Sequence, residues 1–269
     1  MTVNLELTMT NPLARLALPH LPCVLLTFAF SFPALSAPTP PPIYKTPLND
    51  TGVTYCAYGR RCTRNDLGQD AKFGRDKTHN KNADGHAGFS FTKISSDGKP
   101  LKAKARKWAC VKDNVTGLMW ETKTTDINLH NNRWTYSWYE PDSRRNGGDA
   151  GVQRGGVCYG ILPNCNTHDF VAAVNQEGWC GYHDWRLPTL EELVNLIGFH
   201  DQRAANTYAP DLAYFPDSKT TDYRQNLQFW SASSGNGDVA WYFGENLFSY
   251  VNKGKKDEER FVRLVRDGR

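Results

Sequence analysis

The sequence lacks a hydrophobic run long enough to cross a membrane. Its most apolar stretch, at residues 21–30, is about half of the roughly 20 residues that a membrane helix needs. The mean hydropathy of −0.60 excludes a protein with several membrane spans. A strong excess of one charge is also missing, because 32 Lys and Arg face 28 Asp and Glu and leave a net charge of +4. So small an excess does not by itself predict a nucleic-acid partner.

Catalytic signatures are missing as well. The sequence contains no serine-hydrolase elbow, no His-Glu-x-x-His zinc helix, no phosphate-binding loop and no dinucleotide fingerprint. His183 and Asp184 are adjacent, but neighbours on a strand point to opposite faces of the sheet. We therefore expect a protein that is not an enzyme, with no catalytic residue.

The N-terminal segment has the order of a signal peptide. Arg15 precedes the apolar stretch at residues 21–30, and small residues follow at 34–37. This order predicts a signal peptide at residues 1–37 that is cleaved, and an exported protein, periplasmic or extracellular. A short anchor helix is the alternative. Residues 38–48 are rich in proline and are expected to form an extended linker.

The chain has 7 cysteines, and cleavage of the signal peptide with Cys23 leaves six. An even number of cysteines in an exported chain is typical of a disulfide framework. No two cysteines are spaced as CxxC, so metal ligation by cysteine is not expected. Six cysteines can pair in many ways, and we favour two short local loops and one long clamp. These pairs are Cys56–Cys62, Cys158–Cys165 and Cys110–Cys180.

Aromatic residues divide the mature chain into two parts. All 8 tryptophans lie at or after Trp108. Residues 49–107 are therefore expected to form a polar N-terminal arm without a core of its own, and residues 108–269 the main domain. Alternating apolar residues predict strands, and the last four of them a meander. The predicted strands are 88–94 in the arm and 108–113, 118–121, 229–233, 239–243, 248–251 and 261–266 in the domain.

Two short helices are predicted within the domain. The first has Thr167 as its N-cap and ends at Gly178. The second begins with a capping box made by Thr189 and Glu192. A long polar loop at residues 123–163 precedes both helices. The pattern predicts an α+β fold in which two short helices pack on an antiparallel sheet, stapled by disulfides and carrying long loops.

Four segments together resemble one bacterial family. They read NVTGLMWE at 114–121, GYHDWRLPTLEEL at 181–193, FWSAS at 229–233 and FVRLVR at 261–266. Their order and spacing look like the Lcl C-terminal domain family, long listed as a domain of unknown function, over about residues 108–269. Leu264 stands where the family often has cysteine. The string around Arg186 reads as a joint from strand to helix, and we expect Arg263 and Arg266 to pair with Asp184, Glu191 or Glu192 there.

The resemblance implies a C-type lectin-like fold and a binding function. The better-known member of the family implies trimers that bind sulfated glycosaminoglycans and mediate adhesion. A more distant likeness extends to the C-type lectin-like fold that formylglycine-generating enzymes share. Those enzymes need a reactive cysteine pair late in the chain, whereas no cysteine follows Cys180 here. The resemblance therefore favours a binding domain over an oxidase.

Basic residues are the best candidates for a binding site. Residues 99–107 hold five cations in nine positions. In an extended segment Lys102, Lys104 and Arg106 would line one face at about 6.6 Å spacing, which suits sulfates along a polymer. The alternative is a solvated strand edge protected by lysine. The predicted ligand-binding cations are Lys102, Lys104, Arg106, Lys107, Arg144 and Arg145, with Lys253, Lys255 and Lys256 as a third group.

Aromatic and acidic loop residues give weaker signals. Trp134 and Trp138 in the long loop are candidates for stacking on a sugar, with Tyr139 beside them, and core packing is the alternative. The sequence Glu140-Pro141-Asp142 resembles a sugar-binding loop of lectins. Oxygen ligands alternate at Asn80, Asn82 and Asp84 before Gly85, as in a calcium loop, but the twelfth position is Phe91 instead of Glu. No cofactor is therefore expected, and calcium is the alternative.

These patterns predict an exported binding or adhesion domain that is not an enzyme and recognises an extracellular glycan or other polyanion. The alternative is a structural or assembly subunit of the cell envelope with a protein partner. Elution from heparin by a salt gradient would separate the two hypotheses, because attraction between exposed charges weakens with salt.

Overall fold

The computed structural model describes residues 47–53, 55–56, 69–79, 83–198, 210–218, 227–244 and 251–268. The chain divides into two units, Met1–Tyr44 and Lys45–Arg269. The predicted signal peptide lies outside the described residues, as does most of the linker. All elements below belong to the second unit, and none of its described helices is long and apolar enough to cross a membrane.

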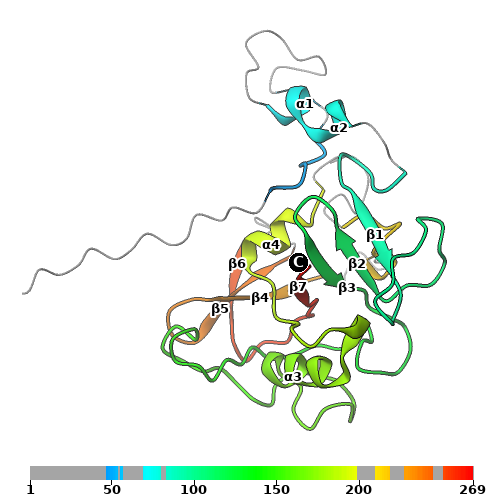
Figure 1. The fold of residues 1–269 in the computed structure, drawn as a ribbon. Coiled ribbons are helices and arrows are strands. Elements are labelled where there is room, and N and C mark those ends of the chain that lie inside the picture. The colour runs from blue at the N-terminus through cyan, green and yellow to red at the C-terminus, as the bar shows by residue number, and fades with distance from the viewer. Residues whose placement is uncertain are drawn as a thin grey trace, which may run out of the picture. The chain divides into compact units, whose positions relative to one another are not determined.

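Four short strands form the first antiparallel sheet, in the order β1-β2-β3-β7 (Figure 1). Their bounds are Phe91–Ile94 for β1, Cys110–Asp113 for β2, Leu118–Glu121 for β3 and Val265–Asp267 for β7. Strand β1 comes from the predicted arm, and its pairing with β2 joins the arm to the main domain. Two helical turns precede it, α1 (Asp70–Phe73) and α2 (Arg75–Thr78).

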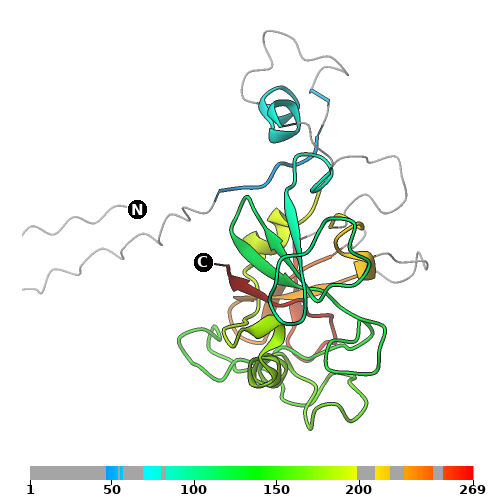
Figure 2. The same cartoon turned by 45° about the vertical axis from the view of Figure 1, so that its right-hand side comes forward.

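The second sheet is a meander of three strands, β4 (Phe229–Ser234), β5 (Val239–Phe243) and β6 (Val251–Lys255). The prediction of a single C-terminal meander was wrong at its last strand, because β7 leaves this sheet and pairs with β3. The reason is burial: Leu264 and Val265 are fully buried, and the backbone of Val265 also bridges to Arg186. The predicted strand at 248–251 lies mostly outside the described residues. Figure 2 shows β7 beside the green strands of the first sheet.

Helix α3 (Thr167–Glu177) and helix α4 (Leu190–Asn195) follow the long loop. The N-cap of α3 is Asn166, one residue before the predicted Thr167, because the Asn166 side chain accepts the Asp169 N–H at 2.8 Å. Gly178 ends α3 in the left-handed conformation, as predicted. The predicted capping box of α4 is confirmed. Single turns of 3-10 helix, η1 (Trp179–Gly181) and η2 (Pro216–Ser218), complete the described helices.

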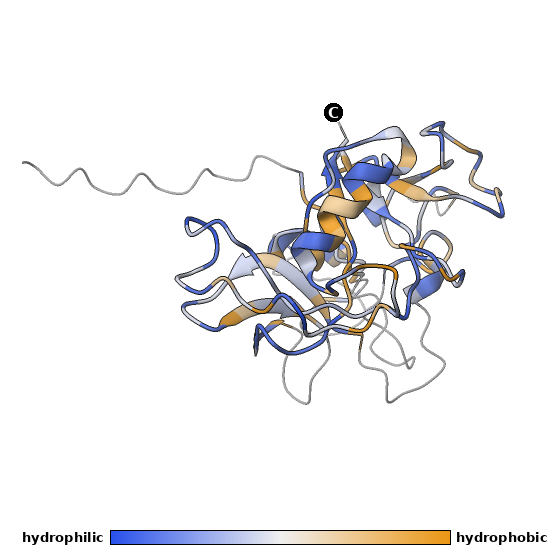
Figure 3. Cartoon of the chain, turned by 90° about the horizontal axis from the view of Figure 1, so that it is seen from below, coloured by the Kyte–Doolittle hydropathy of each residue, from blue (hydrophilic) through white to orange (hydrophobic). Residues whose placement is uncertain are grey.

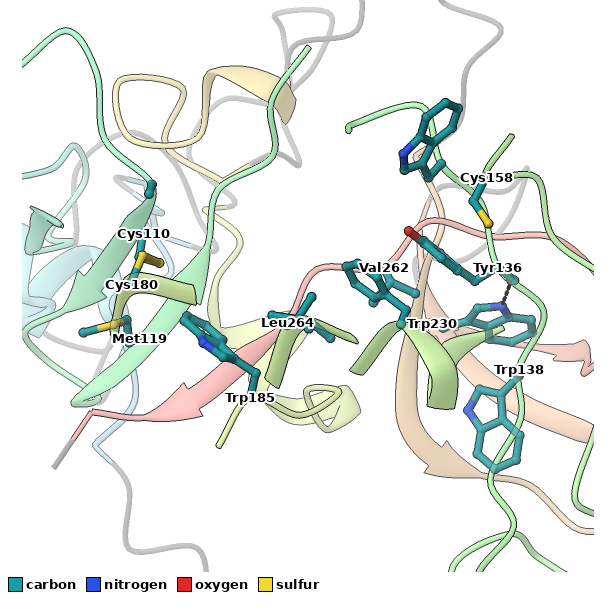
Figure 4. Packing of buried hydrophobic residues seen from close by; sticks show 14 of the residues in the cluster. Cys110, Met119, Tyr136, Trp138, Cys158, Cys180, Trp185, Trp230, Val262 and Leu264 are labelled. Carbon is teal, nitrogen blue, oxygen red and sulfur yellow. Dashed lines mark hydrogen bonds between the residues drawn. A yellow bond between two sulfur atoms is a disulfide. The ribbon is translucent and has the colours of Figure 1, made fainter. Parts of the chain in front are cut away.

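Two hydrophobic clusters form the core. The first surrounds Tyr136, Phe170 and Trp230, and the second surrounds Phe91, Trp120 and Phe215. Figure 4 shows the Trp230 indole donating to the Tyr136 carbonyl, with Trp138 next to it. The loops around the core are largely hydrophilic in colour (Figure 3). The α+β class is confirmed by two antiparallel sheets with few short helices.

Disulfides connect the loops to this core. Cys110 of β2 is bonded to Cys180 of η1, and Cys158 is bonded to Cys165. Both pairs are those favoured from the sequence, and the first lies beside Met119 and Trp185 (Figure 4). Cys56 is disulfide-bonded as well, but its predicted partner Cys62 lies outside the described residues.

The strand-to-helix joint around Arg186 is held by ion pairs. Arg186 donates to both carboxylate oxygens of Glu192 at 2.7 and 2.8 Å. Arg266 pairs with Asp184 at 2.6 Å, one of the predicted partners. Arg263 instead pairs with Asp217, because its buried side chain points to the turn η2. These arginines therefore stabilise the fold.

Candidate functional site

The candidate site is built on residues 99–107, here called the basic loop, which connects β1 to β2 at the edge of the first sheet (Figure 1). The chain does not continue as a strand there, because the Ala105 N–H donates to the Lys102 carbonyl at 2.9 Å and closes a turn. The predicted extended row of Lys102, Lys104 and Arg106 is therefore wrong. The cations are presented by a curved loop instead.

A buried lysine anchors the basic loop from below. Lys93 of β1 donates through Nζ to the Ala105 carbonyl at 3.0 Å. Its ammonium lies 3.6 Å from the ring centre of Trp108 and 5.3 Å from that of Tyr214. Burial lowers the pKa of Lys93. The two aromatic rings hold the Lys93 ammonium in place, and the ammonium in turn holds the backbone of the basic loop at Ala105. The shape of the loop is therefore set by the core and not by its exposed side chains.

The four predicted cations of this loop are exposed, and the acidic groups of the described residues do not neutralise them. The side chains of Lys102, Lys104, Arg106 and Lys107 form no ion pair with any described acidic group. Lys99 differs, because it pairs with Asp97 at 2.7 Å. Four positive charges within six residues are therefore available to a ligand, on a backbone held by Lys93.

The basic loop leaves the sheet at the same end as the segment that follows β3. Cys110 at the start of β2 lies opposite Glu121 at the end of β3. The Thr122 N–H donates to the Ala109 carbonyl at 3.1 Å just beyond this pair. The long loop therefore begins beside the basic loop. Sequence reasoning could not show this, because the order of strands decides it.

The other predicted cations do not join this site. Arg144 pairs with Asp142 at 2.7 Å, and Arg145 pairs with Glu140 at 3.1 Å. The hydrogen bond from Arg144 lowers the pKa of Asp142 to about 2. The two carboxylates of the lectin-like Glu140-Pro141-Asp142 sequence and the two arginines therefore neutralise each other's charge within one loop.

The third group of cations is partly structural. Lys256 is only 1% exposed and donates to the carbonyls of Asn146, Asp149 and Gly237 at 2.6 to 2.7 Å. It was wrongly predicted to be a surface residue. Lys253 lies over the Trp241 ring at 4.6 Å, and Lys255 is exposed.

The predicted aromatic platforms are also corrected. Trp134 is 6% exposed and Trp138 is 1% exposed, so neither ring face is open to a sugar. The Trp138 indole donates to the Ser231 carbonyl at 2.9 Å, which fixes it beneath the second sheet. Tyr139 is partly buried. The long loop thus contributes its indoles to the core, the alternative considered from the sequence.

An exposed aromatic ring that sequence reasoning missed lies nearby. Tyr159 is 80% exposed, and its ring packs edge-on against Trp134 at 5.5 Å between centroids. A sequence signal was present, because Tyr159 follows Cys158 in a loop closed by the short Cys158–Cys165 bridge. A loop of that length has little room to fold its side chains inward.

A buried ionic network lies at the same end of the sheet. Glu121 is fully buried and contacts Lys123 at 2.8 Å and His130 at 2.7 Å. Burial raises the pKa of Glu121, but the charge of Lys123 and the hydrogen bond from His130 outweigh this effect and lower the pKa to about 2. The second ring nitrogen of His130 lies 3.1 Å from Glu177. Through these contacts the network links the end of β3 to the long loop and to helix α3.

The described residues of the predicted calcium loop do not support a calcium site. Asn80 and Asn82 lie outside the described residues. Asp84 is described, and its carboxylate accepts the Ser90 hydroxyl at 2.6 Å. No group of three or more His, Cys, Asp or Glu side chains suited to a metal occurs in the described part of the chain.

Comparisons with known proteins give one match. A family model described as the Lcl C-terminal domain matches residues 109–266. No curated protein and no solved structure matches the chain. The matched residues include both sheets from β2 onward. The basic loop lies just before the first matched residue.

Proposed function

The chain belongs to the Lcl C-terminal domain family, and from this premise and the geometry of the site we propose that it is a non-enzymatic domain that binds an extracellular anionic polymer. The basic loop makes the contact. One observation carries the proposal: Lys102, Lys104, Arg106 and Lys107 are exposed, unpaired with described acids, and held on an anchored backbone. Lysine and arginine that lack an internal partner can bind sulfates or carboxylates without first breaking an ion pair.

We also propose that the protein acts outside the cytoplasm. The Cys110–Cys180 and Cys158–Cys165 bridges are compatible with an oxidising compartment. The resemblance further supports a C-type lectin-like fold and a trimer. A trimer would repeat the basic loop three times and raise the affinity for a long polymer by multivalency.

Heparin affinity chromatography with two charge-matched variants tests the proposal. The first variant replaces the four exposed cations of the basic loop with alanine: K102A/K104A/R106A/K107A. The control removes four cations elsewhere: R144A/R145A/K253A/K255A. We expect the first variant to elute at a clearly lower salt concentration than wild type, because it removes four neighbouring cations that form no ion pair with a described acid. The control should stay closer to wild type, because its Arg144 and Arg145 are already paired with Asp142 and Glu140 and its two lysines lie on another strand, β6.

Two results would contradict this function. An equal decrease in the eluting salt concentration for the two variants would mean that retention on the column depends on net charge alone. Elution of wild type without retention would favour the alternative, an envelope subunit whose partner is a protein. Circular dichroism of each variant checks that the fold is retained.

A further inference from the structure

A groove of about 360 Å³ lies between helix α4 and residues 48–51 of the chain. Its apolar surface comes from Leu48 on one side and from Leu190, Val194 and Ile197 on the other. Leu48 is 79% exposed, and Leu190 and Val194 are half-buried. Ligand sites commonly have volumes of about 300 to 1,000 Å³, with mostly apolar walls and a few polar groups. This groove, here called the α4 groove, has the size and the lining of such a site.

Hydrogen bonds fix the two walls of the α4 groove to each other. The Asn49 N–H donates to the side-chain oxygen of Asn195 at 2.8 Å. The side-chain amide of Asn49 donates to the Asn195 carbonyl at 3.2 Å and to the buried Asp113 carboxylate of β2 at 2.5 Å. The groove is therefore formed in the free protein, and a ligand does not have to order its walls.

The charged groups that line the α4 groove are negative. Asp50 and Glu191 are among its described lining residues, which include no lysine or arginine. Glu191 is exposed and forms no ion pair with a described base. Asp50 is buried, and its carboxylate accepts the N–H groups of Gly52 and Asp76 at 2.7 and 2.8 Å. Burial and the charge of Asp50 both raise the pKa of Asp76, so negative charge accumulates on this side of the groove.

We propose that the α4 groove binds a cationic amphiphile, a small molecule with one amine on an apolar chain or ring. The apolar part lies against Leu48, Leu190 and Val194, and the ammonium lies at Glu191, which it reaches without displacing a described base. A neutral amphiphile gains only the apolar contact, and Glu191 and Asp50 repel an anionic one. The groove shares no residue with the basic loop, and the two select ligands of opposite charge.

The size of the α4 groove favours a small molecule over a protein partner. A specific protein interface buries about 800 Å² on each side. The apolar surface here comes from four side chains, of which only Leu48 is largely exposed. A single apolar chain or ring that enters the groove can contact all four.

Titration calorimetry with three ligands of equal chain length tests the proposal. The ligands are octylamine, octanol and octanoate, each below the concentration at which it forms micelles. We expect octylamine to bind about fivefold more tightly than octanol, the contribution of one exposed charge pair. Octanoate should bind more weakly than octanol, because its charge has the same sign as that of Glu191.

Three variants assign the two parts of the ligand to the two parts of the groove. Glu191→Gln keeps the size of the side chain and should reduce the preference for octylamine over octanol to less than about twofold. Asp257→Asn, the matched control, removes an exposed carboxylate that does not line the groove and should keep the preference of wild type. Leu48→Ser changes an exposed side chain and should weaken octylamine and octanol by the same factor.

Salt gives a second readout. The preference for octylamine should shrink between about 0.1 M and about 0.5 M salt, because Glu191 is exposed, while the affinity for octanol should not fall. No binding of octylamine, equal affinity for the three ligands, or an unchanged preference in Glu191→Gln would overturn the proposal. An affinity that falls as the protein concentration rises would also overturn it, because a second copy of the chain would then occupy the groove. Binding of heparin by the basic loop is independent of all these results.

Discussion

At the scale of single residues, the most demanding feature is the buried carboxylate of Glu121. It accepts from Lys123, His130 and the Leu264 N–H, the last at 3.0 Å. A buried charge stabilises the folded state only while its ionic and hydrogen-bonding partners remain. Glu121 thereby ties the end of β3 to the long loop and to the C-terminal segment.

Neutralising this carboxylate should be costly. We expect Glu121→Gln to lower the free energy of unfolding by about 3 kcal/mol, because the buried Lys123 loses the carboxylate that it contacts at 2.8 Å. Urea unfolding followed by tryptophan fluorescence measures the change. Asp97→Asn, in the exposed pair with Lys99, is the control and should have little effect. A loss no larger than that of the control would show that the network is dispensable.

The same carboxylate predicts a dependence on pH. Its folded pKa of about 2 lies below its ordinary value of 4.5. A lowered pKa contributes stability that is fully present above pH 4.5 and is lost as the pH falls toward 2. The stability difference between wild type and Glu121→Gln should therefore be constant near neutral pH and shrink across that window. A difference that is independent of pH down to 2 would contradict the assignment.

At the scale of elements, the two described disulfides close loops of very different length. Cys110–Cys180 spans 70 residues and clamps β2 to η1, whereas Cys158–Cys165 spans 7. In the chain-entropy account, a longer loop gives the unfolded chain more freedom for the bridge to remove.

Removing each bridge should separate these contributions. We expect Cys110→Ala/Cys180→Ala to lose about 4 kcal/mol and Cys158→Ala/Cys165→Ala about 2 kcal/mol. Guanidinium unfolding of the two double variants measures both values. Equal losses would mean that native packing around the sulfurs, and not loop length, sets their effect.

Local sequence predicted most of the elements. The bounds of β3 and β5 agree with the alternating runs, and the Thr189 capping box locates α4, because these signals act over a few residues. The sheet that β7 joins could not be predicted from local sequence. Its alternating residues fit either sheet, and long-range contacts decide that its backbone pairs with β3 and with Arg186.

At the scale of the whole molecule, the sequence located the charges but not their surroundings. The basic loop was found from composition, yet its turn at residues 102–105 depends on Lys93, which lies in β1. For Trp134 and Trp138 the sequence left both stacking on a sugar and core packing open, because distant contacts decide whether an aromatic side chain is exposed. Tyr159 differs, because the short Cys158–Cys165 loop that carries it was a local signal of its exposure.

The pairing of β3 with β7 also has a consequence for biosynthesis. Leu118 finds its partner only in Asp267, almost at the end of the chain. A nascent chain whose β7 is still inside the ribosome therefore lacks one edge of its first sheet, and such long-range closure is slow. The first sheet stays open at β3 until the segment that contains Asp267 has been synthesised and has left the ribosome.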